Sequence, residues 1–444
     1  MKKRIAFIAL NYLRILSNFQ IKKIHPLIIG VGGASGKTSL CNFIYLIFAE
    51  KYKVKQGKGK NSETGIPLDI LNLSPSDYSY SEWLKIFIKA PLKAILDHKK
   101  YDIYVAEMGI DSPVEPKNMS YLLKIIKPDI AVLTNISYEH STYFDPLVTD
   151  EEFDNRGKGI LELTTKQESL LLTSVSDKGW VVLNIDDENI RKIEPEVKAR
   201  VLTISKKVRS SDFYIEEIKN FVDEFLIIFK HEGKRYKLKI DNPLPEHFAY
   251  TFLSAIAVAK AGGIRVDDAV SALEKDFYLP AGRMSFFKGI KDTIIIDSSY
   301  NNATLSPILD LLSFVKEVGK QRRRIGIIGD MRELGTMSRA LHEEVGRKIL
   351  ETLDVAILIG PLSQQYILPI LKRKHFPVFS FLNFSSARAT IIDEVKPKDI
   401  ILVKGSQNTL FLERAVEILL ENPKDRDNLC RRGEYWDRIR AKTL

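Results

Sequence analysis

The sequence predicts an α/β protein with two domains, each built on a mainly parallel β-sheet that helices cover on both faces. Two observations lead to this prediction. At 444 residues, the chain is too long for one ordinary domain. Short apolar runs alternate with segments of helical length before residue 212, and the same alternation begins again after residue 284.

Four apolar runs predict strands of the first domain, at residues 26–31, 101–109, 128–135 and 180–188. Residues 38–50 have the pattern of the helix that follows the first of these strands. Between residues 212 and 240 the pattern changes, and "FLIIFKHEGKRYKLKI" predicts a β-hairpin that turns near Glu232 and Gly233.

Five further apolar runs predict a second, Rossmann-like domain, at residues 292–302, 323–330, 354–360, 376–383 and 398–406. The segment "LPAGRMSFFKG" precedes them, and we place the domain boundary near Ala281–Met284. The chain is thereby divided into an N-terminal segment (1–25), a central domain (26–283) and a C-terminal domain (284–444).

The composition is that of a soluble globular protein, with 45% hydrophobic and 28% charged residues. The two cysteines, Cys41 and Cys430, are far apart, which fits a reducing cytoplasm and argues against a disulfide framework. The net charge of +10 is spread along the chain without a nucleic-acid motif. Anionic substrates or a membrane surface are therefore better partners for this charge than nucleic acid.

Residues 1–25 carry six Lys or Arg and no acidic residue. Their apolar run, Ile5–Leu10, is much shorter than the roughly 20 residues of a spanning helix, and no small-residue cleavage site follows it. Two interpretations remain open. The segment is a helix that docks on the next domain, or it is a basic amphipathic helix that lies on the inner face of a membrane.

The stretch "GVGGASGKTS", residues 30–39, has the composition of a nucleotide-binding loop but matches neither standard pattern. A Walker A loop would need glycine at Val31. A dinucleotide fingerprint that begins at Gly30 would need glycine at Ser35.

The end of the loop favours a nucleoside triphosphate. The glycines allow a tight turn that directs successive N–H groups to one place at a helix N-terminus, where negative charge is favoured. Lys37 adds a positive charge for the β- and γ-phosphates, and Thr38 offers a hydroxyl to Mg²⁺. The alternative is a glycine turn with an incidental lysine.

Glu107 lies near the end of one predicted strand and His140 follows another closely, at the edge of the sheet where α/β proteins bind ligands. With Thr38 they would give Mg²⁺ a hydroxyl, a carboxylate and an imidazole. Imidazole is an unusual ligand for this ion, which prefers oxygen.

Several motifs occur in an order that resembles the Mur ligase family, most of all its MurF type, which adds D-alanyl-D-alanine to a peptidoglycan precursor. The motifs are "GGASGKTS" (32–39), "KNSETGIPL" (60–68), "AEMGID" (106–111), "TNISYEHSTYF" (134–144), "LNIDDE" (183–188), "PAGRM" (280–284), "IDSSYNN" (296–302), "GDMRELG" (329–335) and "VKGSQ" (403–407).

The resemblance implies a central domain that binds ATP through a P-loop and forms an amide bond through an acyl phosphate. It implies nucleotide-binding roles for Gly33, Ala34, Ser35, Gly36, Lys37, Thr38, Ser39, His247, Arg283, Asp297 and Asn301. It implies two Mg²⁺ ions held by Thr38, Glu107, His140 and Lys166, the last as a carbamylated lysine, because "TKQE" resembles the family's A-K-x-E segment. Lys37, His140, Lys166 and Arg283 are the expected catalytic residues.

The sequence also departs from the family. In "EHFAYT", Phe248 and Thr251 stand where the family has two asparagines beside the retained His247. Only 25 residues precede the first strand, so the family's N-terminal UDP-binding domain is expected to be missing. The D-N-P-R signature of diaminopimelate addition is not found in the C-terminal domain.

We therefore predict an ATP-dependent ligase of cell-wall synthesis that joins a sugar-peptide or peptide acid to an amino-acid or dipeptide amine. MurF-like addition of D-alanyl-D-alanine is the favoured reaction. Two alternatives remain open: a related ligase of the polyglutamate or pseudomurein type, and a non-catalytic nucleotide-binding partner.

Overall fold

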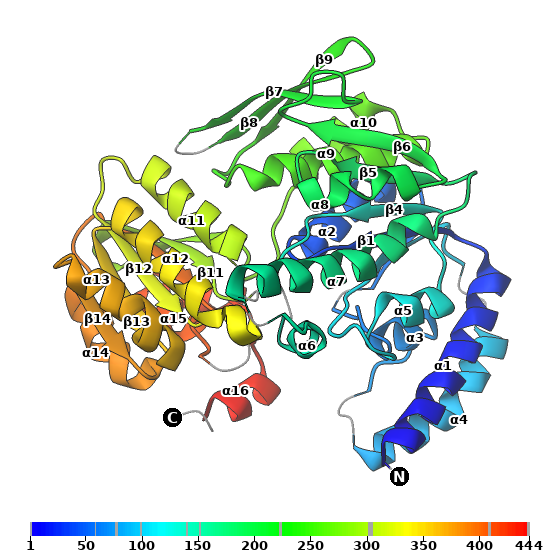
Figure 1. The fold of residues 1–444 in the computed structure, drawn as a ribbon, viewed down its shortest axis with the longest axis horizontal. Coiled ribbons are helices and arrows are strands. Elements are labelled where there is room, and N and C mark those ends of the chain that lie inside the picture. The colour runs from blue at the N-terminus through cyan, green and yellow to red at the C-terminus, as the bar shows by residue number, and fades with distance from the viewer. Residues whose placement is uncertain are drawn as a thin grey trace.

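The computed structural model describes residues 2–57, 59–75, 79–97, 100–138, 141–150, 152–221, 224–300, 305–406 and 410–441. Within these residues it contains two β-sheets, one on each side of the segment 277–284, and helices pack on both faces of each sheet (Figure 1). The predicted α/β class is confirmed.

In the central sheet the described strands have the order β2-β3-β1-β4-β5-β6-β7-β8-β9. Neighbours are parallel from β2 to β7, and β7, β8 and β9 are antiparallel. Their bounds are β1 (Leu27–Gly32), β2 (Val54–Gln56), β3 (Ile103–Glu107), β4 (Ile130–Leu133), β5 (Trp180–Asn184), β6 (Arg200–Ser205), β7 (Phe213–Asn220), β8 (Phe225–His231) and β9 (Lys234–Ile240).

The four strands predicted for this domain are present as β1, β3, β4 and β5, and the predicted hairpin is β8–β9. Glu232 and Gly233 form its turn with φ of 48° and 75°, the positive values that a tight two-residue hairpin needs. Strands β2, β6 and β7 were not predicted. Strand β2 has three residues, fewer than the four to eight over which a strand pattern can be recognised.

Helices α2, α9 and α10 cover one face of the central sheet, and α5 and α7 cover the other (Figure 1). Helix α1 packs against α3, α4 and α5 beside this sheet. The helices up to the domain boundary are α1 (Lys2–Ile24), α2 (Lys37–Ala49), α3 (Gly65–Ile70), α4 (Tyr80–Leu96), α5 (Met119–Ile125), α6 (Ser141–Phe144), α7 (Phe153–Thr173), α8 (Glu188–Arg191), α9 (His247–Ala261) and α10 (Val266–Asp276).

The described strands of the C-terminal sheet have the order β10-β11-β15-β12-β13-β14, and among them only β10 is antiparallel to its neighbour. The five predicted strands are present, and the edge strand β10 was not predicted. Bounds are β10 (Ser285–Gly289), β11 (Thr293–Ser298), β12 (Arg324–Gly329), β13 (Val355–Ile359), β14 (Val378–Phe381) and β15 (Ile400–Lys404).

Both faces of this second sheet are buried, because helices lie on each of them. Ile295 packs in the cluster formed with α14 and α15, whereas its neighbour Ile296 packs in the cluster formed with α11 and α12. The helices are α11 (Leu305–Val318), α12 (Ser338–Thr352), α13 (Leu368–Arg373), α14 (Phe384–Glu394), α15 (Glu413–Leu419) and α16 (Glu434–Ala441).

The two domains touch where α6 meets the loop that follows β12. The Thr142 amide donates to the Glu333 carbonyl oxygen at 3.1 Å, and the Thr336 amide donates to Asp145 Oδ2 at 3.0 Å. Burial alone would raise the pKa of Asp145, but hydrogen bonds from Thr336 and Arg156 outweigh it and lower that pKa. The charged carboxylate therefore joins both domains.

Candidate active site

A cavity of about 650 Å³ lies between the two domains. Its wall is formed by the loop before α2, the residues after β3, the N-terminus of α9, the segment 280–284, and the ends of β11 and β15. Because the carboxyl ends of strands from both sheets reach this cavity, it is where an α/β protein would be expected to bind its ligands.

The loop between β1 and α2 is held in place by the end of β4. Gly33 and Gly36 have φ of 105° and 81°, and a Cβ on Gly33 would come within 2.4 Å of Thr134 Oγ1. The Ser35 amide donates to Asn135 Oδ1 at 2.9 Å. Glycine is thus required at position 33 by both conformation and space.

Lys37 and Glu168 fix the same turn from its two sides. Lys37 Nζ donates to the carbonyl oxygens of Gly33 and Ala34 at 2.5 and 2.8 Å. The Gly33 amide donates to Glu168 Oε2, on α7, at 3.2 Å. The ammonium group therefore lies over the turn, in the wall of the cavity.

Thr38 and Glu107 form a hydrogen-bonded pair in the cavity wall. Thr38 Oγ1 donates to Glu107 Oε2 at 2.8 Å, and Asn61 Nδ2 donates to Oε1 of the same carboxylate at 3.3 Å. All three residues line the cavity, and Glu107 is 7% exposed. A hydroxyl beside a carboxylate suits Mg²⁺, which takes its other ligands from water and substrate phosphates. Among the described residues no group of three or more His, Cys, Asp or Glu could hold a metal ion.

The structure does not bring Lys166 to the P-loop turn, and its role as a metal ligand stays a prediction. Its side chain is exposed on α7, whereas Glu168 is buried against the loop. Residues two apart on a helix point roughly 200° away from each other, so Lys166 and Glu168 cannot both face the loop. Carbamylation of Lys166 as a metal ligand is not supported by this placement. His140 and Asn301 lie outside the described residues.

Arg283, in the segment between the domains, lines the cavity with its guanidinium over the ring of Tyr300, 5.1 Å from the ring centre. His247 also lines it, with Nδ1 3.2 Å from Asp310 Oδ2 and its ring 4.8 Å from that of Phe248. Both predicted residues are therefore brought to the P-loop by the fold.

Asp297 does not reach the cavity. It is fully buried at the end of β11, where Oδ1 accepts a hydrogen bond from the Ser299 amide at 3.0 Å. Its Oδ2 has no hydrogen-bond partner among the described residues. Burial raises the pKa of Asp297 to about 6. The neighbours Ser298 and Tyr300 line the cavity instead.

Lys404 and Arg431 line the cavity but were not identified from the sequence. Lys404 ends β15 and is 1% exposed, an unusual burial for lysine. Arg431 forms a fully buried ion pair with Glu413, at 2.6 Å, and donates to the Ser299 carbonyl oxygen at 3.0 Å. Lys404 lies in a motif noted for the family, whereas no signal marked Arg431.

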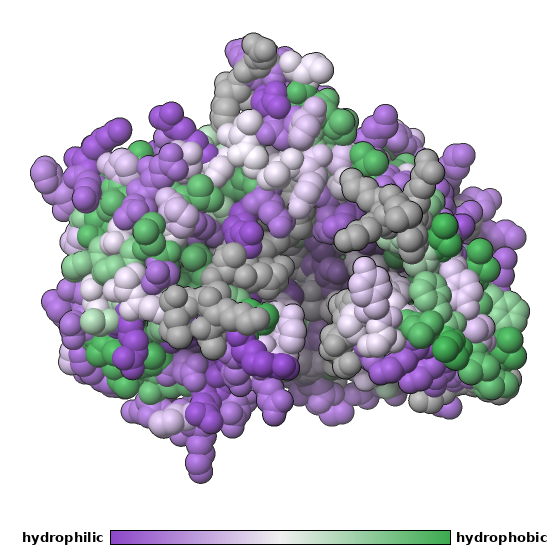
Figure 2. Space-filling view, turned by 90° about the horizontal axis from the view of Figure 1, so that it is seen from below, coloured by the Kyte–Doolittle hydropathy of each residue, from purple (hydrophilic) through white to green (hydrophobic). Residues whose placement is uncertain are grey.

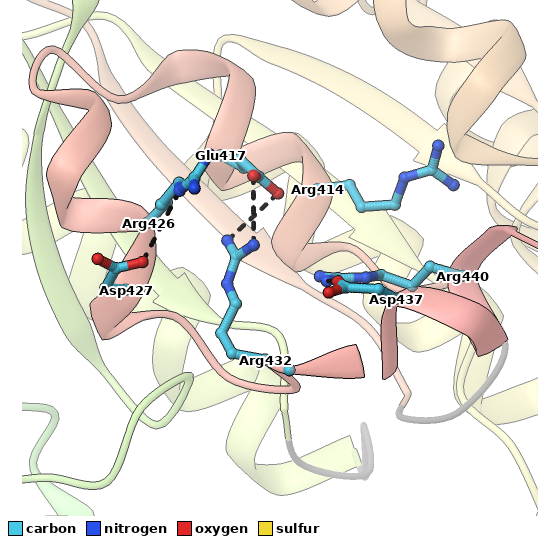
Figure 3. Close-up of a pocket in the computed structure, with 8 residues that line it drawn as sticks. Arg414, Glu417, Arg426, Asp427, Arg432, Asp437 and Arg440 are labelled. Atoms are coloured by element: carbon cyan, nitrogen blue, oxygen red, sulfur yellow. Dashed lines mark hydrogen bonds and ion pairs between the residues drawn. The ribbon is translucent and has the colours of Figure 1, made fainter. Parts of the chain in front are cut away.

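A second cavity, of about 500 Å³, lies beside α15 and α16 (Figure 3). It is lined by Arg414, Arg426, Arg432 and Arg440 together with Glu417, Asp427 and Asp437. Arg432 pairs with Glu417 of α15 at 3.2 Å, and Arg440 lies 3.9 Å from Glu413. These ion pairs fasten residues 423–441 to α15, and so hold Arg431 in the wall of the main cavity.

Fold and site together define a protein with a P-loop domain, a second α/β domain and a cavity between them. The Mur ligase middle domain matches residues 31–259, more than half of the chain, and the Mur ligase, glutamate ligase domain matches residues 282–407. The chain therefore belongs to the Mur ligase family and is an enzyme of that family.

The chain is similar to two UDP-N-acetylmuramoyl-tripeptide–D-alanyl-D-alanine ligases. It is 22% identical to that of Borreliella burgdorferi, with 92% of this chain and 78% of the relative covered, and 23% identical to that of Bacillus subtilis, with 93% and 80% covered. Its fold is similar to MurF ligase from Thermotoga maritima in complex with ADP, with a TM-score of 0.74, 20% identity, and 94% and 84% coverage.

If the cavity binds a nucleoside triphosphate with its cation, replacing Lys37 or Glu107 with alanine should lower nucleotide-dependent turnover by about 100-fold or more, because each change removes a charge that would neutralise or hold them. ADP release measures the effect, and circular dichroism checks the fold. Lys166→Gln is the matched control. Because Lys166 is exposed on α7, the turnover of the Lys166→Gln variant should stay at the parent's value. A loss in Lys166→Gln as deep as in Lys37→Ala would restore the role first predicted for it.

Asp297→Asn should change how stability depends on pH. The folded-state pKa of about 6 lies above the unfolded value, so ionising Asp297 costs the folded protein stability as pH rises from about 4 to about 6. Relative to the variant, the parent should lose on the order of 3 kcal/mol across this window. Denaturant unfolding of both proteins at pH 4, 5, 6 and 7 measures the difference. A constant difference across all four would contradict the assignment.

Proposed function

We propose that this protein is an ATP-dependent ligase that adds D-alanyl-D-alanine to a muramyl-tripeptide precursor of the cell wall. The observation that carries the proposal is the single cavity in which the P-loop, the Thr38–Glu107 pair and Arg283 meet. The names of the relatives, which this chain matches over most of its length, support the choice of acid and amine.

The reaction has two steps. The substrate carboxylate attacks the γ-phosphorus of ATP, the bond to the β-phosphate oxygen breaks, and ADP leaves. The amine nitrogen then attacks the acyl carbon, the bond to the phosphate oxygen breaks, and phosphate and a proton leave. The protein needs to position the reactants and neutralise the phosphoryl charge, and little covalent chemistry is left to its side chains.

Each side chain has a role in this scheme. The Lys37 ammonium would neutralise the β- and γ-phosphates, next to the loop carbonyls that it now bonds. Thr38 and Glu107 would hold Mg²⁺, which supplies charge neutralisation to the transferring phosphoryl group. Arg283, held over Tyr300, would bring a second cation to the phosphates from the segment between the domains.

The contact between α6 and the loop after β12 would keep the cavity closed during the reaction. Water must be excluded because an acyl phosphate hydrolyses readily. Asp145 supports the closed arrangement, since its carboxylate bonds Thr336 of the other domain as well as Arg156 of its own.

The proposed location is the inner face of a membrane, with contact through residues 1–25. Within them, Lys2–Ile24 form α1, which exposes Ile8, Ile15 and Phe19. No helix among the described residues is long and apolar enough to cross a membrane. Contact along the surface is therefore the form proposed.

ADP release by the purified protein tests the reaction. With Mg²⁺ and ATP, release should require both UDP-N-acetylmuramoyl-tripeptide and D-alanyl-D-alanine, and mass spectrometry should find the joined product. Each substrate alone is the control for uncoupled hydrolysis. Release with a different acid and amine would assign another ligase reaction to the same site, and no release with any pair would contradict the catalytic role.

A further inference from the structure

Helices α1 and α4 together form one exposed apolar surface, which we call the α1–α4 face. Of the 18 large hydrophobic side chains exposed in the described chain, ten lie on these two helices. They are Phe7, Ile8, Ile15, Phe19, Tyr80, Leu84, Ile88, Leu92, Ile95 and Leu96. We propose that the α1–α4 face docks on an anionic lipid surface.

Helix α1 is apolar on two sides. Leu10, Leu13 and Ile21 are buried against the protein. On the other side Ile8, Ile15 and Phe19 are 68%, 61% and 52% exposed, and their spacing of seven and then four residues keeps them on one stripe. The buried side is enough to hold the helix in place, so folding does not account for the second stripe.

Helix α4 shows the same arrangement with three separate stripes. Residues 86, 90 and 94 are buried. Residues 84, 88 and 92 are leucine or isoleucine and are 52–63% exposed. Residues 85, 89 and 93 are exposed lysines that run alongside the apolar stripe. An apolar stripe beside a row of lysines is the pattern of a helix that lies in a membrane interface.

The two helices are joined into one unit. Tyr12 Oη donates to the Phe87 carbonyl oxygen at 3.1 Å, and the two rings lie 5.5 Å apart. Leu13, Ile86 and Ala90 belong to one buried cluster between them. The helices lie side by side at the lower right of Figure 1, and apolar side chains gather at the right edge of the face seen in Figure 2.

The positive charge of the two helices indicates what docks on the α1–α4 face. Helix α1 carries six Lys or Arg and helix α4 three, against the single acidic residue Glu82. Binding of an apolar patch in a neutral groove of another protein would not require this excess of positive charge. A surface of anionic lipids attracts each cation and accepts the apolar side chains between them. The inference extends the proposed contact of residues 1–25, because α4 supplies half of the surface.

The face is also connected to the cavity. Helix α1 packs on α3, and α3 begins directly after the loop that carries Asn61. Asn61 bonds Glu107 in the cavity wall. A docked protein would therefore hold this side of its site close to the lipid surface.

The test is co-sedimentation of the full-length protein with vesicles of phosphatidylcholine, alone or mixed with phosphatidylglycerol. We expect binding to the mixed vesicles only, weakened when salt is raised from about 0.1 M to about 1 M, which shortens the screening length from about 10 to about 3 Å. Equal binding to both vesicle types, or binding to neither, would overturn the proposal.

Variants separate the contributions of the two helices. Leu84→Gln, Ile88→Gln and Leu92→Gln combined should weaken vesicle binding on the order of tenfold or more, as should Ile8→Gln, Ile15→Gln and Phe19→Gln combined. Leu382→Gln, which changes a side chain 57% exposed on the other domain, is the matched control and should bind like the parent. Loss with the α1 variant alone would restrict the contact to α1 and overturn the two-helix surface.

A second copy of the chain is the competing occupant. Analytical ultracentrifugation of the parent and the α4 variant, without lipid, tests it, and a dimer that the α4 variant abolishes would overturn docking on lipid. ADP release with soluble substrates is measured in parallel. Because vesicle binding does not depend on turnover, failure of the ligase assignment and failure of the docking surface can be told apart.

Discussion

The turn between β1 and α2 is the constraint on which the rest of the site depends. Gly33 must adopt a positive φ against Thr134, where a Cβ would collide with a hydroxyl oxygen. Once that turn is made, α2 begins at Lys37, and Thr38 comes within 2.8 Å of Glu107 at the end of β3. The order β3-β1-β4 supplies both neighbours, because Glu107 ends one flanking strand and Asn135 follows the other. The arrangement of the loop, Thr38 and Glu107 is thus a consequence of strand order.

Sequence reasoning placed residues correctly where a polar side chain lies at the end of a buried strand. Glu107 lies at the end of β3 as predicted, since buried apolar runs mark strands and polar residues mark their ends. Such reasoning is less informative on a helix, where the side of the helix on which a residue lies determines whether it can face the site. Lys166 and Glu168 lie in one motif, but α7 mixes polar and apolar residues so evenly that its buried side could not be read from the pattern. Asp297 shows a different limit, because it lies within β11 between two neighbouring strands and is fully buried, whereas Ser298 and Tyr300 line the cavity.

The segment that ends the described chain contributes to the cavity through a buried charge pair. The side chains of Glu413 and Arg431 are 0% and 1% exposed. Removing either one would leave the other as an unpaired buried charge and lower the stability of the fold by about 3–5 kcal/mol. Outside the cavity, Arg432 bonds Glu417 of the same helix, α15. Residues beyond the matched range 282–407 therefore form part of the site, and no motif could have shown this, because the contact depends on distant helices packing together.

The two interpretations of the first 25 residues do not exclude each other. A helix that docks on the protein needs one apolar side, which α1 has in Leu10 and Leu13. A helix that lies on a membrane needs an apolar side facing outward, which α1 has in Ile8 and Ile15. An isolated helix of this kind would contact a membrane through its own apolar stripe alone. Here α4 fixes its orientation and adds a second stripe, so the protein would meet a lipid surface as a rigid two-helix unit.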